Sequence, residues 1–206
     1  MTHNSLSKKD RKALRKAGGP SGNKRTIILL AGFTVLVIAA IGVFSFLVTG
    51  GGGNDQSFTP NTNGLLPVGS QAPDFSAQTV DGGNVSLGDR GNYKATMLVF
   101  FASWCPHCNR EAPLISDIQK NHDDLRVIMA GIDGQDNNQK VQDFVNKYDI
   151  NGPAFYDPSV GSTYHASSYP TIYVIDGSGK IAAANSGEVP KDVLDGWVQN
   201  VLGSSG

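Results

Sequence analysis

The stretch that decides the fold is "KATMLVFFASWCPHCNRE", residues 94–111 of a 206-residue chain. Residues 94–103 form an almost continuous apolar run of strand length, which favours a central strand buried on both faces. Beyond Pro106 the apolar residues follow helical spacing to about Lys120, so the strand leads directly into a helix. The chain has only two cysteines, Cys105 and Cys108, and both lie at this junction.

The position of the two cysteines favours redox chemistry. A thiolate is the nucleophile in disulfide exchange, and the N-terminus of a helix stabilises negative charge. Cys105 is expected in the exposed first turn, where it attacks, while Cys108 lies three residues on and resolves the mixed disulfide. The pair itself is then the redox centre, and we expect no cofactor.

Two other roles for the pair are disfavoured. A structural disulfide between Cys105 and Cys108 would close a very short loop and contribute little, because stabilisation grows with loop length. A closed zinc site takes four ligands, and the chain has no second cysteine pair, although His107 and His165 are available. We therefore expect no metal site.

Further along the chain, apolar patterns and turn residues alternate in a regular way. We expect a β-hairpin over 75–87, a buried strand over 126–133, a helix over 137–150, a second hairpin over 171–185 and a final helix over 190–202. Strands that alternate with helices predict an α/β fold with a central mixed sheet flanked by helices.

The N-terminal quarter has a different character. The first 50 residues carry eight basic residues and one acidic residue, whereas the remainder carries nine basic and 17 acidic residues. Residues 26–48 contain no charge, and about 20 apolar residues suffice to cross a bilayer as a helix. A cleaved signal peptide has a shorter apolar region and a small-residue cleavage site, which "VTGGGG", residues 48–53, matches poorly. We expect a single retained transmembrane helix.

The charge distribution also predicts topology. Positive charges flank the cytoplasmic end of a membrane span, so residues 1–25 form a basic cytoplasmic tail. Residues 49–65 are rich in Gly, Asn and Thr and are expected to be a flexible linker to an extracytoplasmic domain, residues 66–206. The protein is thus expected in the cell membrane as a single-pass protein. Topology explains the basic tail, so no nucleic-acid partner is expected.

Two motifs carry a family resemblance. "FFASWCPHC", residues 100–108, and "YPTIYVIDGSGKI", residues 169–181, together resemble thioredoxin-fold thiol-disulfide oxidoreductases over roughly residues 66–202. The resemblance implies a thioredoxin fold with an N-terminal β-hairpin extension, and a Trp104 that shields the redox site. It also implies a cis bond before Pro170, in line with the near-restriction of cis peptides to proline. Tyr169, Pro170 and Thr171 would then bind an extended substrate.

A finer resemblance concerns Glu111. This glutamate and the segment "VGSQAPDFSAQTVDGGNVSLGD", residues 68–89, are similar to the membrane-anchored TlpA/ResA-like branch. That resemblance implies that Glu111 manages the proton of Cys108, whereas its position alone leaves a solvated helix glutamate equally open. Peroxiredoxins begin similarly, but Ala102 stands where the threonine of their motif is expected, which disfavours a peroxidase.

Two features of the sequence predict opposite directions of electron flow. Pro106 and His107 resemble the dipeptide of the DsbA oxidases, and a partly cationic His107 would stabilise the Cys105 thiolate and make the disulfide more oxidising. The TlpA/ResA-like frame with Glu111 instead resembles thiol reductases of cytochrome c maturation. We favour an oxidant that forms disulfides in exported proteins, with the reductase as the alternative.

The expected partners follow from this chemistry. Substrates are exported proteins that contain cysteine, and a membrane redox partner must restore the oxidised pair, because nothing in this chain performs that step. We expect a monomer. A non-enzymatic alternative is a peptide-binding or chaperone module with a vestigial cysteine pair, since one fold can host many functions.

Overall fold

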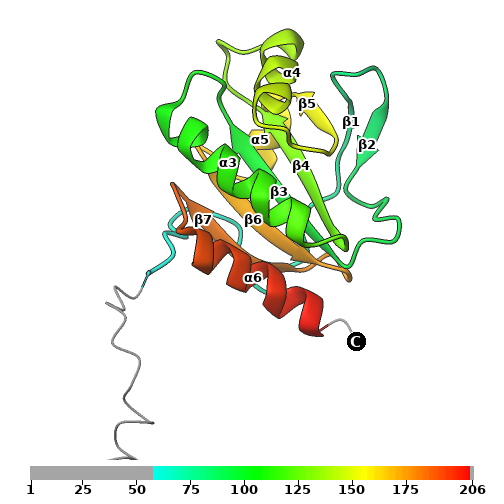
Figure 1. Ribbon diagram of the computed structural model, residues 1–206, viewed down its shortest axis with the longest axis vertical. Helices are drawn as coiled ribbons and strands as arrows, with labels where there is room; N and C mark the ends of the chain where they lie inside the picture. The colour runs from blue at the N-terminus through cyan, green and yellow to red at the C-terminus, as the bar shows by residue number, and fades with distance from the viewer. Residues whose placement is uncertain (1–57, 205–206) are drawn as a thin grey trace, which may run out of the picture. The chain divides into compact units, whose positions relative to one another are not determined.

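A computed structural model describes residues 58–204, which form a five-stranded mixed sheet with helices on its faces (Figure 1). The strand order is β5-β4-β3-β6-β7. The central strand β3 (Ala95–Phe101) pairs in parallel with β4 (Leu125–Gly131) and antiparallel with β6 (Thr171–Asp176). The edges are β5 (Ala154–Tyr156) and β7 (Ile181–Ser186). The predicted central mixed sheet is confirmed.

All seven residues of β3 are buried, which is why its sequence is apolar without alternation. Successive side chains of a strand point to opposite faces. Met97, Val99 and Phe101 enter the core on one face of the sheet, while Leu98 and Phe100 enter the core on the other. Because both faces are covered, each side chain of the strand is removed from water. For a large apolar residue this burial stabilises the folded state by about 1.5–3 kcal/mol.

Three helices cover one face of the sheet, namely α3 (Pro106–Asn121), α4 (Asn138–Lys147) and α6 (Lys191–Ser204). Ile115 of α3, Phe144 of α4 and Leu194 of α6 all belong to the same apolar core. The ring centroids of Phe101 and Phe144 lie 4.4 Å apart. Helix α3 is therefore held firmly at the C-terminal end of β3, which is where both cysteines stand.

The opposite face is covered by the hairpin of β1 (Ser76–Gln78) and β2 (Asn84–Ser86) and by α5 (Pro158–Thr163). The hairpin is a separate antiparallel pair, as predicted for residues 75–87. The N–H of Val80 donates to the carbonyl of Ala154 at 2.8 Å, which attaches the hairpin next to β5 (Figure 1). The second predicted hairpin, formed by β6 and β7, is also present.

Two elements, β5 and α5, were not predicted from the sequence. The strand has three residues and the helix six, so neither is long enough to show a periodic pattern. A local signal for α5 does exist. The Asp157 side chain accepts the N–H of Ser159 at 2.9 Å as an N-cap, and Pro158 occupies the first helical turn.

The first described residues lie along the sheet and α6. The Phe58 and Trp197 rings are 6.1 Å apart, and the N–H of Asn61 donates to Oδ1 of Asn185 at 2.7 Å. The predicted cytoplasmic tail and membrane span precede residue 58 and lie outside the described residues. Within residues 58–204, none of the helices has the length and apolar character that crossing a bilayer requires.

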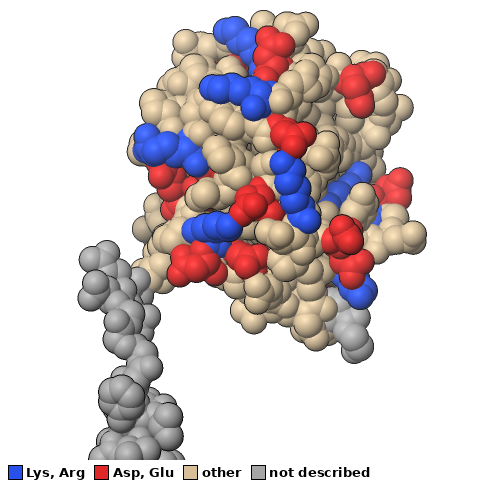
Figure 2. Space-filling view, in the orientation of Figure 1, with Lys and Arg blue, Asp and Glu red and all other residues tan. Residues whose placement is uncertain are grey.

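Charges of both signs are interspersed on the face shown in Figure 2. Many of the domain's surface charges are paired, for example Lys120 with Asp149 at 2.6 Å and Lys94 with Asp124 at 3.0 Å. A nucleic-acid-binding face instead gathers Lys and Arg in a patch or stripe. The face in view shows no such patch, and the absence of a nucleic-acid partner stays a prediction for the chain.

Candidate active site

Cys105 is the N-cap residue of α3, with extended backbone angles of φ −70° and ψ 122°. The predicted place at the start of the helix is confirmed, but the predicted exposure is wrong, because the side chain packs into the core and is only 5% exposed. Its N–H donates to the carbonyl of Ala102 at 3.1 Å, and its own carbonyl accepts from the side chain of Asn109 at 2.8 Å. Pro106 follows at the start of the helix, where its missing N–H costs nothing. The first turn of α3 has no acidic residue, so the partial positive charge of the helix end acts on Cys105 undiminished by α3 itself.

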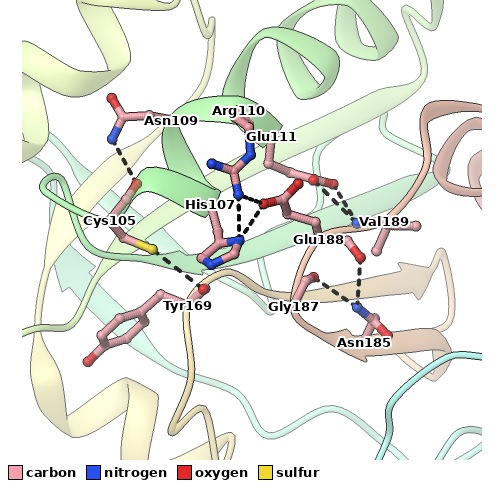
Figure 3. A network of polar contacts seen from close by, with 10 residues as sticks. All are labelled: Cys105, His107, Asn109, Arg110, Glu111, Tyr169, Asn185, Gly187, Glu188 and Val189. Atoms are coloured by element: carbon pink, nitrogen blue, oxygen red, sulfur yellow. Dashed lines mark hydrogen bonds and ion pairs between the residues drawn. The ribbon is translucent and has the colours of Figure 1, made fainter.

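The loop before β6 lies against Cys105. The Tyr169–Pro170 peptide bond is cis, as the resemblance implied. The Cys105 Sγ donates to the Tyr169 carbonyl oxygen at 3.5 Å (Figure 3). Thr171, by contrast, has no exposed surface, and its hydroxyl donates to the carbonyl of Ser168 at 2.8 Å. Of the three expected substrate-binding residues, Tyr169 is the one whose backbone contacts the thiol of Cys105.

Cys108 and Glu111 lie one turn further along α3 and are almost fully buried, with exposed fractions of 2% and 1%. Together with Pro170 they line a small apolar cavity that has no room for a water molecule. Both Glu111 carboxylate oxygens accept the N–H of Val189 at 3.3 Å (Figure 3). Glu111 is thus a core residue and not a solvated helix glutamate.

Burial sets the protonation of both groups. It raises the pKa of the Cys108 thiol far above its ordinary value, and the nearby Cys105 adds to this rise. Burial also raises the pKa of Glu111 to about 7, against the opposing effect of the Val189 N–H. A carboxyl group that titrates near neutral pH can either give or take a proton, and it shares its cavity with a thiol that strongly resists ionisation.

His107 and Arg110 project from the exposed side of α3 toward one carboxylate, Glu188, in the loop between β7 and α6 (Figure 3). Nη2 of Arg110 lies 2.7 Å from Nδ1 of His107, and both groups contact Oε1 of Glu188. Nδ1 donates to Glu188 when it carries the proton, and accepts from Arg110 when it does not. Hydrogen bonding from Arg110 lowers the pKa of Glu188, which therefore stays anionic.

Trp104 forms the rim of the site and is half exposed. Its indole N–H donates to Oδ1 of Asp133 at 3.0 Å, and the hydroxyl of Tyr169 donates to Oδ2 of the same carboxylate at 3.4 Å. The two rings meet edge to face at 6.3 Å. Asp133 therefore binds both aromatic side chains and holds them together, while Trp104 keeps half of its surface exposed. That Trp104 shields the redox site stays a prediction.

Sequence reasoning missed three charged residues of this site: Arg110, Asp133 and Glu188. Arg110 carried a usable signal, because residues three apart share a helix face and His107 stands three positions before it. Asp133 lies two residues after the end of β4, where polar residues often reach a site. Glu188 carried no local signal. Within residues 58–204, no group of three or more His, Cys, Asp and Glu side chains could hold a metal ion.

Comparison with known proteins gives a consistent result. Residues 68–184 match the AhpC/TSA family. The chain is 34% identical over 133 residues to the thioredoxin-like protein YneN of Bacillus subtilis. This alignment covers 63% of this chain and 78% of that protein. It is 28% identical over 138 residues to the thiol-disulfide oxidoreductase ResA of Bacillus cereus, and this alignment covers 66% of this chain and 79% of that protein.

A solved structure extends the comparison to the fold. The thiol:disulfide interchange protein of the thioredoxin family from Chlorobium tepidum superposes with a TM-score of 0.58 at 26% identity. The match covers 66% of this chain and 99% of that one. The thioredoxin fold expected from the two sequence motifs is thus confirmed.

Proposed function

The chain belongs to the AhpC/TSA family and is a thiol-disulfide oxidoreductase of the thioredoxin fold, and we propose that Cys105 and Cys108 are its redox pair. Enzymes of this kind act through a cysteine pair and need no further cofactor. One observation carries the assignment of roles. Cys105 stands at the N-cap of α3 beside the Tyr169 carbonyl, whereas Cys108 is enclosed with Glu111 in an apolar cavity.

We favour an oxidant of exported proteins. A substrate thiolate attacks Sγ of Cys105 and breaks the Cys105–Cys108 bond, and the departing Cys108 thiolate takes the proton of Glu111. A second substrate thiolate then attacks the substrate sulfur of the mixed disulfide, and Cys105 leaves as a thiolate. Two electrons pass from the substrate to the enzyme pair. The helix N-terminus and the guanidinium of Arg110 support this direction, because positive charge near a thiol favours its thiolate, and His107 adds to this effect when it is protonated.

The substrate is held, in this proposal, by the rim of the site. Trp104 supplies a partly exposed aromatic surface, and the backbone of Tyr169 pairs with an extended segment of the substrate. Thr171 supports that loop from inside the core. The substrates are cysteine-containing exported proteins, and a membrane redox partner reoxidises the pair. The protein acts as a monomer anchored by residues 26–48, with residues 1–25 in the cytoplasm and the catalytic domain outside.

A reductase is the second candidate, and the enclosure of Glu111 with Cys108 favours it. A thiol whose pKa is raised by burial needs a base before it can resolve a mixed disulfide, and Glu111 with a pKa of about 7 is suited to that task. The steps described above then run in reverse, and a thiol-donating membrane protein supplies the electrons. The same residues serve both directions, so the equilibrium potential decides between them.

A titration of the full chain in detergent against glutathione buffers separates the two candidates. The oxidant requires a reduction potential well above the value of about −270 mV that thioredoxin has. A value near or below that figure would establish the reductase instead. The companion assay follows oxidative refolding of reduced RNase by the wild-type protein and by Cys105→Ser. A Cys105→Ser variant that retained full activity in cells would point to the non-enzymatic module.

A further inference from the structure

Two consecutive residues of the loop between β7 and α6 contact α3, one in the core and the other at the surface. Val189 donates its N–H to the buried carboxylate of Glu111, while Glu188 directs its carboxylate outward to His107 and Arg110 (Figure 3). The loop therefore places one negative charge beside His107 and Arg110, which lie within the first five residues of α3 after Cys105. The role proposed above for the cysteine pair does not use Glu188.

The position of Glu188 is enforced by its neighbours. Gly187 has φ +108°, a conformation that favours glycine, and its N–H donates to the carbonyl of Pro170 at 2.8 Å. The buried side chain of Asn185 donates to the carbonyls of Gly187 at 2.8 Å and Glu188 at 3.5 Å. With Val189 bound to Glu111 on its other side, Glu188 is fixed on both flanks against the site.

The charges of this cluster reach the reactive thiol. Arg110 has a raised pKa, mainly because Glu188 binds it and in part because the Cys105 thiolate is near. The guanidinium contacts the Glu188 carboxylate directly and acts on Cys105 at longer range. Reduction of the disulfide takes two electrons, with one proton when Cys105 becomes a thiolate and two when it becomes a thiol. Only the reduced form has a sulfur at Cys105 that can carry charge, so nearby charge changes the energy of the reduced form and not that of the disulfide.

We propose that Glu188 is a positioning residue that sets the redox poise of the pair: it binds His107 and Arg110 together and offsets their stabilisation of the Cys105 thiolate. The disulfide is then less oxidising than the Pro106-His107 dipeptide and Arg110 alone would make it. This inference rests on the proposed redox pair, and it applies to the oxidant and to the reductase alike.

The test measures the equilibrium constant of the full chain with glutathione for wild type and for Glu188→Gln. The variant keeps the shape of the side chain and removes its charge, so the constant for reduction should rise about fivefold, which equals about 20 mV for a two-electron couple. Arg110→Gln should shift the constant in the opposite direction, and Glu188→Asp should restore a value near that of wild type. These shifts should shrink at high ionic strength, because the groups are exposed.

Asp117→Asn is the matched control. It removes an exposed carboxylate of α3, well beyond the first turn, that pairs with Lys191 of α6, and it should leave the constant unchanged. An unchanged or lower constant in Glu188→Gln would overturn the proposal, as would shifts of the same sign in Glu188→Gln and Arg110→Gln. A wild-type protein that forms no Cys105–Cys108 disulfide in these buffers would refute the redox pair itself, and the wild-type potential alone decides the direction.

Discussion

Cys108 and Glu111 lie one turn apart on α3 and line the same waterless cavity, although the two side chains differ in how they ionise. Burial raises the pKa of both groups, yet only that of Glu111 comes close to neutral pH. Proton exchange between a thiolate and a carboxyl group in such a cavity cannot rely on bulk water. The relationship makes Glu111 the natural proton donor or acceptor for Cys108, whichever way the electrons flow.

Glu111→Gln should slow the exchange step that releases Cys108 by about 10²-fold, because the amide cannot give up a proton. In the wild type, the single-turnover oxidation rate, corrected for the thiolate fraction of the substrate, should fall as pH rises through about 7, since only the protonated carboxyl group donates. Stopped-flow measurements between pH 5 and pH 9 check both points. A variant that kept the wild-type pH profile would refute this role.

The same carboxyl group should affect stability. Its pKa is raised from 4.5 to about 7 in the folded state, so the folded protein binds more protons than the unfolded chain between these values. The contribution of Glu111 to the free energy of unfolding is therefore complete below about pH 4.5 and is lost as pH rises through about 7. The loss amounts to up to about 3 kcal/mol. Urea unfolding of the reduced wild type and of Glu111→Gln should diverge over this range, with the variant gaining at higher pH.

Incubated with a protein substrate that carries a disulfide, Cys108→Ser should accumulate a mixed disulfide: Cys105 attacks one substrate sulfur, the other substrate sulfur leaves as a thiol, and no resolving thiol remains. Cys105→Ser should accumulate almost none, since the Cys108 thiol has a raised pKa and lies in a closed cavity with Glu111, away from the N-cap of α3. Non-reducing gels after an acid quench, followed by mass spectrometry of the linked peptides, measure the two species. Equal trapping by both variants would show that the assigned roles of attack and resolution are wrong.

Trp104→Ala should weaken substrate binding while leaving the redox pair intact. The indole is half exposed and is held by Asp133, so it is a preorganised aromatic contact for an incoming chain. We expect KM for a reduced protein substrate to rise about tenfold, equivalent to about 1.4 kcal/mol, with an unchanged potential. Tyr93→Ala, which truncates an exposed aromatic residue in the loop before β3, serves as the matched control. A changed potential in Trp104→Ala would indicate a different role.

Residues 26–48 should anchor the protein. The full chain, expressed in bacteria, should remain in the membrane fraction after carbonate extraction, and external protease should degrade residues 66–206 in spheroplasts. A chain that lacks residues 1–48 should instead be found in the soluble fraction. Recovery of the full chain as a soluble protein would refute the anchor, and protection of the domain from external protease would refute the predicted topology.

By itself, the sequence determined the central strand, both hairpins and the helix that carries Cys105 and Cys108, because these features depend on local apolar patterns and turn residues. Family resemblance added the cis bond before Pro170 and singled out Glu111. The sequence could not determine whether Glu111 is solvated or buried, since its helix position allowed both. Packing of α3 between the sheet and the loop at Val189 decided that.

Only the tertiary structure brought Glu188 to His107 and Arg110, across 81 and 78 residues of chain. Asp133 reaches Trp104 in the same way, from the end of a neighbouring strand. Such contacts follow from the strand order and from the path of each loop over α3, which no local pattern encodes. The chemistry proposed for the cysteine pair could therefore be predicted from eighteen consecutive residues, while the charges around it were decided by which distant loops the fold brings to that helix end.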